Sequence, residues 1–312
     1  MADRRFLPIS RVAPESLLPL LEEEAAAWLA DLRWDYAPIR QILVSLARRR
    51  LLPGYAALDG AGRAVAYSYF LVTRSKGVIG ALYASRSLPP EEPLDRLLAL
   101  TVDGLKGSPA IRRVEAQIMP FHRRDPTEGF TRRAFRHWAR QYLERALTAG
   151  DEHHAPAPGK IIPWDAARLE DTGGVTLAAY REQADAEICA DYGTRAGCEA
   201  YVRSLVGNPG CGIFMPAASF MALDEAGAPC AYIVCSRISA RAAMIPQIAV
   251  HPARQGNGLG RALMARTLAR LYHTGFESVS LTVTERNARA FDWYRRLGFL
   301  PRRRFGAYVW ER

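Results

Sequence analysis

The feature that most constrains this chain is an apolar run that leads into a glycine-rich turn and then into a helix. Ile248-Ala249-Val250 has the composition of a strand, and Gln255-Gly256-Asn257-Gly258-Leu259-Gly260 follows four residues later. Glycine permits a positive φ and removes side chains that would block close approach to the backbone. A helix start supplies unpaired N–H groups and the positive end of the dipole, so this turn predicts an anion site for phosphate.

Two well-known phosphate motifs do not fit this turn. The dinucleotide fingerprint needs G-x-G-x-x-G, whereas Gly256, Gly258 and Gly260 lie at alternate positions. The P-loop needs Lys-Ser/Thr after its last glycine, but Arg261-Ala262 stands there. By itself the turn therefore leaves two alternatives open, a phosphate site and a tight strand-to-helix connection.

Pro246 adds a separate observation. It lies inside the apolar segment from Met244 to Val250. Proline cannot donate to a sheet ladder and usually marks a sheet edge or a bulge. A strand that leaves backbone groups unpaired at its C-terminal end is able to pair with an extended ligand instead.

These residues resemble the GCN5-related N-acetyltransferases, the GNAT superfamily, over about residues 165–312. The first signature of that family, Gln/Arg-x-x-Gly-x-Gly/Ala, is matched by the residues from Gln255 to Gly260. The second signature is an Asn, then a Tyr seven residues later, then Leu-Gly-Phe. It is matched by Asn287, Tyr294 and Leu297-Gly298-Phe299. Two motifs in the right order are more specific than either one.

The resemblance implies acetyl-CoA as the acyl donor. It implies that pantetheine lies beside the strand, that the pyrophosphate lies on the glycine turn with Arg254 or Arg261 adding charge, and that Asn287 contacts the cofactor arm as well as capping its helix. It also implies that Tyr294 protonates the departing CoA thiolate. The cofactor-binding residues predicted in this way are Ile248, Ala249, Val250, Gln255, Gly256, Asn257, Gly258, Leu259, Gly260, Arg261 and Asn287.

The general base is not identified by this resemblance. Many relatives carry a Glu on the strand before the glycine turn, whereas this chain has Gln247 thereabouts, and an amide is no base. Four acidic residues remain as candidates for the base or for binding a cationic amine: Asp185, Glu187, Asp191 and Glu285. Placing amine and thioester together also accelerates the reaction, so a strong base is not obligatory.

The order of predicted elements repeats along the 312 residues. We therefore predict an α/β (α+β) protein of two tandem GNAT-like domains, each a mixed, mostly antiparallel twisted sheet flanked by helices. Residues 1–155 form a degenerate copy and residues 160–312 the catalytic copy, joined through a loop that holds His153-His154. In the first copy the pattern predicts strands at Gly54–Leu58, Ala64–Val72 and Val78–Ala84 and a strong helix from Thr131 to Leu147.

The first copy lacks the features of a CoA site. Ser85 to Pro93 follows its strand Val78–Ala84, and no glycine turn is present. The acidic pair Glu91-Glu92 repels a pyrophosphate. We expect this copy to pack against the other one and to shape the acceptor cleft without binding CoA.

Composition excludes several other classes. The net charge of +10 permits polyanion binding, but no basic block is interleaved with aromatics, so nucleic acid is disfavoured. The sequence shows no apolar run of membrane-spanning length, no secretory signal, and five cysteines without a C-x-x-C pair. We predict a cytoplasmic N-acetyltransferase without a metal, which moves an acetyl group to a primary amine of a small molecule or peptide. The alternative is a non-catalytic acyl-CoA-binding sensor or interaction module.

Overall fold

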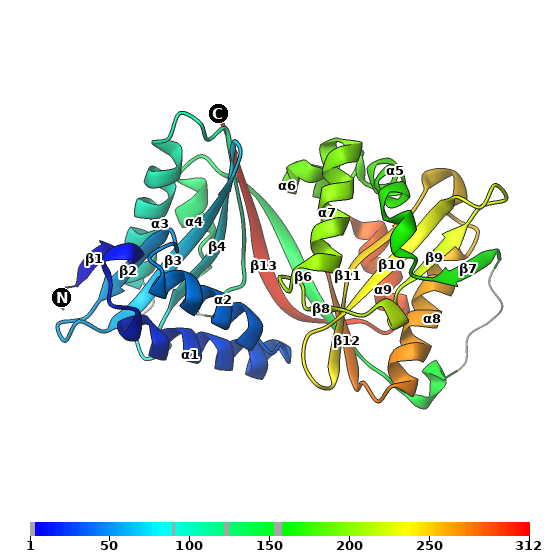
Figure 1. Ribbon diagram of the computed structural model, residues 1–312, viewed down its shortest axis with the longest axis horizontal. Coiled ribbons are helices and arrows are strands. Elements are labelled where there is room, and N and C mark those ends of the chain that lie inside the picture. Colours follow the sequence, from blue (N-terminus) through cyan, green and yellow to red (C-terminus); the bar gives the residue numbers. More distant parts are fainter. Residues whose placement is uncertain (1–3, 89–90, 122–124, 153–157) are drawn as a thin grey trace. The chain divides into compact units, whose positions relative to one another are not determined.

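The structure, a computed structural model, describes residues 4–88, 91–121, 125–152 and 158–312. The chain forms two compact units (Figure 1). Unit 1 comprises Met1–Arg140 and Arg304–Arg312, and unit 2 comprises Gln141–Arg303. Strands β6 (Arg136–Ala146) and β13 (Leu300–Glu311) run from one unit into the other. The predicted domains 1–155 and 160–312 rest on the repeated order of the expected elements and stay a prediction.

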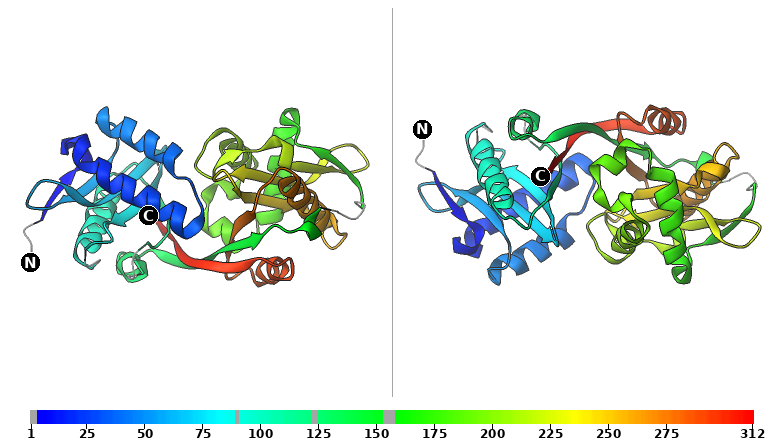
Figure 2. Two further views of the ribbon diagram at one scale, coloured as in Figure 1. Left: turned by 90° about the horizontal axis from the view of Figure 1, so that it is seen from below. Right: turned by 90° about the horizontal axis from the view of Figure 1, so that it is seen from above.

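Unit 1 is a sheet with helices on both faces. Its strands lie in the order β1 (Arg5–Pro8), β2 (Gly54–Leu58), β3 (Ala64–Thr73), β4 (Lys76–Ala84), β5 (Arg113–Ile118) and β13. Neighbouring strands are antiparallel except for the parallel pair β4–β5. In Figure 2 the blue helices α1 (Pro14–Leu32) and α2 (Ala37–Arg48) lie on one side of the cyan sheet, and α3 (Glu91–Lys106) lies on the other.

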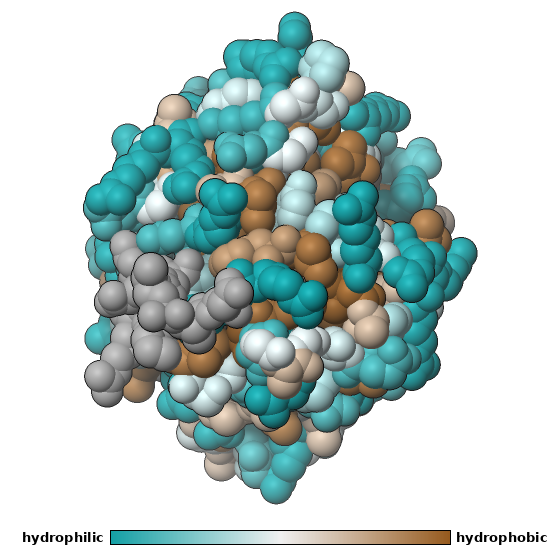
Figure 3. Space-filling model, turned by 90° about the vertical axis from the view of Figure 1, so that its left-hand side faces the viewer, coloured by the Kyte–Doolittle hydropathy of each residue, from teal (hydrophilic) through white to brown (hydrophobic). Residues whose placement is uncertain are grey.

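The main core of unit 1 lies between its sheet and α3. Leu97, Leu98, Val102 and Leu105 of α3 are each at most 1% exposed, and they pack on apolar side chains of the strands. Large apolar side chains also remain exposed in this unit: Leu29, Ile42, Leu51, Leu71 and Val72. Figure 3 shows a hydrophobic area surrounded by hydrophilic side chains on the face drawn there.

The predicted helix from Thr131 to Leu147 is wrong. The structure has a short helix α4 (Thr127–Thr131), a left-handed Ala134 with φ 62°, and then strand β6. The Ala, Arg, Gln and Leu residues of this segment favour a helix, but Tyr142 is buried and its hydroxyl donates to Ser280 on the neighbouring strand at 2.7 Å. Because pairing in a sheet outweighs the weak intrinsic preference of a segment, the tertiary contacts decide its conformation.

Unit 2 repeats this plan. Its strands lie in the order β6, β12 (Ser278–Thr284), β11 (Ala242–Val250), β10 (Pro229–Arg237), β9 (Phe220–Leu223) and β7 (Lys160–Pro163), and the short β8 (Ile213–Phe214) pairs with β10. Helices α8 (Leu259–His273) and α9 (Ala288–Arg296) cover one face, and α5 (Leu169–Tyr180) and α7 (Arg195–Gly207) cover the other (Figure 1). The predicted class, mixed sheets flanked by helices, is confirmed.

The final strand contributes to the core of unit 1. Residues 306–311 of β13 pair antiparallel with β5. The ring of Tyr308 is fully buried and stacks on Phe130 at 3.9 Å between centroids, and its hydroxyl lies 2.9 Å from Thr127 Oγ1. The C-terminal residues of the chain therefore complete the hydrophobic core of the N-terminal unit.

We expect Tyr308→Ala to destabilise unit 1 by about 3–5 kcal/mol, because truncating a buried aromatic side chain leaves a cavity. Denaturant unfolding followed by circular dichroism measures this change. The control is Tyr308→Phe, which keeps the ring and removes only a hydroxyl contact worth about 1 kcal/mol. Equal stability of the two variants would contradict the assignment of Tyr308 to this core.

Candidate active site

Strands β11 and β12 pair over only part of their length. Their parallel ladder runs from Ala242↔Ser278 to Met244↔Ser280 and stops there, although β11 continues to Val250 and β12 to Thr284. On the other side, the ladder of β11 with β10 shifts register between Val234 and Ser236, opposite Pro246. Pro246 thus lies at a bulge, as its position in the sequence predicts.

The backbone groups of β11 alternate between the two sides of the strand. The N–H of His251 donates to the carbonyl of Cys230, a residue of β10, at 2.9 Å. Ala249, two residues before His251, pairs with Tyr232 of the same strand. In an antiparallel ladder the backbone groups of successive residues point alternately toward and away from the partner strand. The N–H and C=O groups of Ile248 and Val250 therefore point away from β10, to the side where β12 has diverged. Ala249 instead directs its backbone groups toward β10.

Two side chains reach the open side of β11. The hydroxyl of Tyr180, at the end of α5, donates to the Ile248 carbonyl at 3.0 Å. Gln255 Nε2 donates to the Val250 carbonyl at 3.1 Å. These contacts satisfy two carbonyl groups and leave the N–H groups of Ile248 and Val250 facing the space beyond the strand.

The glycine turn has the backbone that its composition predicts. Gly256 and Gly258 have φ of 81° and 80°, in the left-handed region that favours glycine, and Gly258 is the N-cap of α8. Leu259 is buried in the core, so only its backbone is available to a ligand. The first N–H groups of a helix have no partner within it, and here they point toward the turn.

Several arginines surround this turn. Arg254 forms an ion pair with Glu225, with an N···O distance of 3.3 Å, and Arg261 is exposed in the first turn of α8. Arg289, which the sequence analysis did not single out, extends from α9 and donates to Gln255 Oε1 at 3.2 Å. A guanidinium at this position adds positive charge beside the helix start. No motif identifies Arg289, because only the fold brings α9 to the turn.

Asn287 and Tyr294 belong to α9, as predicted. The Asn287 side chain caps the helix by accepting from the N–H of Ala290 at 3.1 Å. Tyr294, two turns later, is 8% exposed and packs against Phe299 with 5.9 Å between ring centroids. Burial raises the pKa of the Tyr294 phenol well above its usual value, and the nearby Asp185 carboxylate raises this pKa further. The phenol therefore stays protonated at neutral pH.

Gln247, which precedes Ile248 on β11, is 3% exposed. Its Oε1 accepts from the Tyr192 hydroxyl at 3.0 Å, and the amide also hydrogen-bonds with the Tyr232 side chain. Tyr192 also stacks on Tyr180 with 4.5 Å between ring centroids. An amide held in this way orients neighbouring groups but accepts no proton.

The four acidic candidates lie in different surroundings. Asp185, in the short helix α6 (Ala184–Ile188), accepts from the Thr284 hydroxyl at 3.0 Å. Glu285 accepts from Gln141 Nε2 at 2.6 Å, and Glu187 lies 3.9 Å from Arg286. Asp191 lies 3.7 Å from the Cys189 thiol. Of the four, Asp185 is the one whose charge affects the pKa of both Tyr294 and Tyr180.

Unit 1 has the same divergence of strands. The parallel pairing of β4 with β5 ends at Ile79↔Ala116, although β4 continues to Ala84. The carboxylate of Glu23 occupies the end of β4, where it accepts from the Tyr83 hydroxyl at 3.1 Å and from Ser85 Oγ at 2.7 Å. The side chains of Glu91 and Glu92, predicted to repel a pyrophosphate, and His153-His154 lie outside the described residues.

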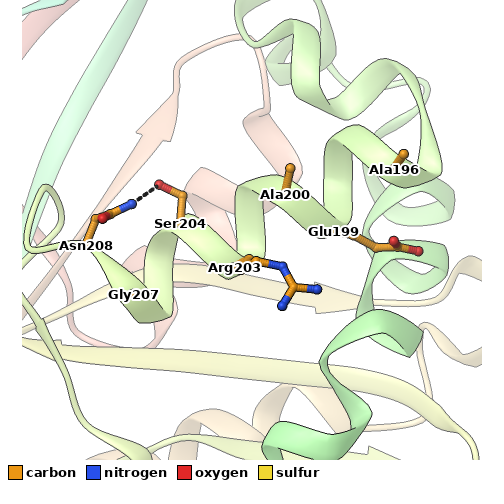
Figure 4. A pocket seen from close by; sticks show the side chains of 7 residues that line it. All are labelled: Ala196, Glu199, Ala200, Arg203, Ser204, Gly207 and Asn208. Atoms are coloured by element: carbon orange, nitrogen blue, oxygen red, sulfur yellow. Dashed lines mark hydrogen bonds between the residues drawn. The ribbon is translucent and has the colours of Figure 1, made fainter. Parts of the chain in front are cut away.

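Other parts of the structure add no chemistry to this site. A pocket on one face of α7 is lined by none of the predicted cofactor residues (Figure 4); its lining is Ala196, Glu199, Ala200, Arg203, Ser204, Gly207 and Asn208. Among the described residues, no group of three or more His, Cys, Asp or Glu side chains is placed to hold a metal ion. In the same part of the chain, no helix has the length and apolar character needed to cross a membrane.

Residues 189–299 match the family described as the Acetyltransferase (GNAT) family, and this segment includes both predicted signatures. The C-terminal half carries a GNAT acetyltransferase domain. Mycothiol acetyltransferase from Frankia casuarinae is 45% identical over 65 residues, which make up 21% of this chain and 19% of that protein. The match therefore spans about a fifth of that relative's length.

The fold of the whole chain, GNAT domain included, is also found in solved structures. A GCN5-related N-acetyltransferase from Sphaerobacter thermophilus superimposes with a TM-score of 0.66 at 17% identity, over 100% of this chain and 97% of its own. A tandem GNAT protein from the clavulanic acid biosynthesis pathway has a TM-score of 0.66 at 15% identity, over 99% and 98%. At this identity the similarity concerns the fold, which is that of a tandem GNAT protein.

Proposed function

We propose that unit 2 transfers an acetyl group from acetyl-CoA to a primary amine. The GNAT family transfers acyl groups from acyl-CoA to amines, and the observation that carries the narrower proposal is the divergence of β11 from β12 after Met244. The N–H groups of Ile248 and Val250 face the resulting open side. They are suited to pair with the amide groups of pantetheine as a neighbouring strand would.

The phosphates of CoA are proposed to bind at the turn that follows. The helix start at Gly258 provides backbone N–H groups, and Arg261 and Arg289 provide charge. Asn257 and Gly256 are exposed there, so the backbone is accessible to a ligand. The thioester at the other end of the cofactor then lies toward Tyr294, whose phenol supplies a proton to the departing thiolate.

Calorimetric titration of the protein with acetyl-CoA tests the cofactor proposal. We expect one binding site per chain, because unit 1 has no glycine turn after β4 and the carboxylate of Glu23 lies at that strand end. The control titrant is dephospho-CoA, which lacks the 3′-phosphate and separates recognition of that group from recognition of the pyrophosphate. Absence of binding at millimolar acetyl-CoA would refute the proposal.

Release of CoA in the presence of amines distinguishes an enzyme from a non-catalytic acyl-CoA sensor. The panel contains spermidine, glucosamine, lysine and an alanine dipeptide, and free thiol is the readout. We expect release that depends on at least one of these amines. Binding of acetyl-CoA without amine-dependent release from a broader panel would favour the sensor.

A further inference from the structure

Helices α5, α6 and α9 carry side chains to the region where β11 and β12 diverge. Tyr180 reaches the strand from α5, because its hydroxyl donates to the Ile248 carbonyl. Tyr294 reaches the same region from α9, and Asp185 comes from α6. Asp185 accepts a hydrogen bond from Thr284 at the end of β12 at 3.0 Å, and its carboxylate raises the pKa of both Tyr180 and Tyr294.

The carboxylate of Asp185 is held in a defined orientation. Thr284, the last residue of β12, is fully buried and donates its hydroxyl to Asp185 Oδ1 at 3.0 Å. The N–H of Asn287 donates to the Thr284 carbonyl at 2.9 Å, and Asn287 caps the helix that carries Tyr294. A short chain of hydrogen bonds thus links the carboxylate to the start of the helix that carries the proposed acid.

The position usually taken by the base carries no proton acceptor here. Gln247 is an amide, and its oxygen already accepts from Tyr192. Glu187 and Glu285 have partners that direct them elsewhere, to Arg286 and Gln141.

We propose that Asp185 is the residue that binds the acceptor amine and accepts its proton, an assignment that rests on the acetyl-transfer function proposed above. The neutral amine nitrogen attacks the thioester carbonyl carbon, a C–N bond forms, and the carbonyl electron pair moves to oxygen. The nitrogen, now positively charged, passes one proton to the Asp185 carboxylate. The electron pair on oxygen then re-forms the carbonyl as the C–S bond breaks with its electron pair on sulfur, and Tyr294 gives its phenol proton to the thiolate.

The two proton carriers return to their starting states within the site. Asp185 holds one proton more and Tyr294 one proton fewer after the transfer, and passage of that proton from the carboxyl group to the tyrosinate restores both. Atoms balance, since an amine and acetyl-CoA give an N-acetyl amine and free CoA. A basic tyrosinate next to a carboxylic acid makes this return favourable.

The test compares Asp185→Asn with Glu187→Gln, a matched substitution in the same short helix. We expect Asp185→Asn to lower kcat/KM for the fastest amine of the panel about 10²-fold, which is the lower end of the range for proton transfer by a positioned side chain. Its affinity for acetyl-CoA should stay within about twofold of the wild type, which also shows that the variant folds. Glu187→Gln should change neither quantity more than about twofold, as expected for an exposed surface ion pair.

Two further readouts separate a proton acceptor from a merely structural residue. Hydroxylamine, a nucleophile that is neutral at pH 7, should react with Asp185→Asn within about threefold of the wild-type rate, because it needs little help in losing a proton. Asp185→Glu should recover part of the activity.

Each outcome bears on the proposal. An Asp185→Asn variant that binds acetyl-CoA and loses no more amine activity than Glu187→Gln overturns the role of Asp185 and leaves the acetyl-transfer function intact. Equal losses with amine and hydroxylamine also overturn it, because they indicate a structural effect. A wild-type protein without any amine-dependent release of CoA refutes the proposed function, and the role of Asp185 with it.

Discussion

Tyr294→Phe should lower kcat about 10²- to 10³-fold while leaving the affinity for acetyl-CoA within about twofold of the wild type. The phenol is 8% exposed, and burial raises its pKa, so the group is protonated at neutral pH and has a proton to give when the thiolate departs. Phenylalanine preserves the ring that packs on Phe299, so binding of the cofactor should persist while proton donation is lost. Steady-state kinetics and calorimetry measure the two effects.

The matched control is Tyr142→Phe, a second buried tyrosine of unit 2. Tyr142 lies on β6, and its hydroxyl donates to Ser280 Oγ on β12 at 2.7 Å. Ser280 belongs to the part of β12 that is paired with β11. This variant should lose about 1 kcal/mol of stability and keep its kcat. An unchanged kcat in Tyr294→Phe would refute the role of Tyr294 as acid, and a similar fall in both variants would point to a general loss of packing.

Gly258→Val should weaken acetyl-CoA binding more than about 10²-fold. We expect it to remove two backbone hydrogen bonds to phosphate, each of which contributes about 1.5 kcal/mol to binding. Gly258 has φ of 80° and caps α8. A β-branched residue is strained in that conformation and tends to move the backbone out of it. The N–H groups of the first turn would then no longer converge on a phosphate. Calorimetry with acetyl-CoA provides the measurement.

Gly275 provides a control with the same backbone strain. It also has φ of 80°, and no other atom lies within 4 Å of the Cβ that a substitution would add. It follows the C-terminal end of α8, fifteen residues after the end of the glycine turn at Gly260. Gly275→Val should therefore reduce stability by about 1–3 kcal/mol and leave the affinity for acetyl-CoA unchanged. Equal losses of affinity in the two variants would contradict a specific role for the turn.

The local sequence predicts those parts of the site that are contiguous. The bulge at Pro246, the left-handed glycines and the capped helix at Asn287 all follow from residues next to one another, and the structure has each of them. Each of these conformations depends on the φ angle of one residue or on a hydrogen bond to a residue nearby in the chain, so the neighbouring residues determine it. The predicted helix from Thr131 to Leu147 was wrong because its residues favour a helix locally, while a distant strand supplies their hydrogen-bond partners.

The sequence by itself predicted the resemblance to the GNAT family, the conformation of the glycine turn and Tyr294 as the candidate acid. Only the tertiary structure decided that Tyr180 bonds to β11 and Asp185 to the end of β12, that Arg289 stands beside the glycine turn, and that the last strand completes the core of the first unit. These residues are far apart along the chain, so no spacing links them. Packing of the helices on the sheet brings them together, and the carboxylate nearest the proposed acid becomes recognisable only then.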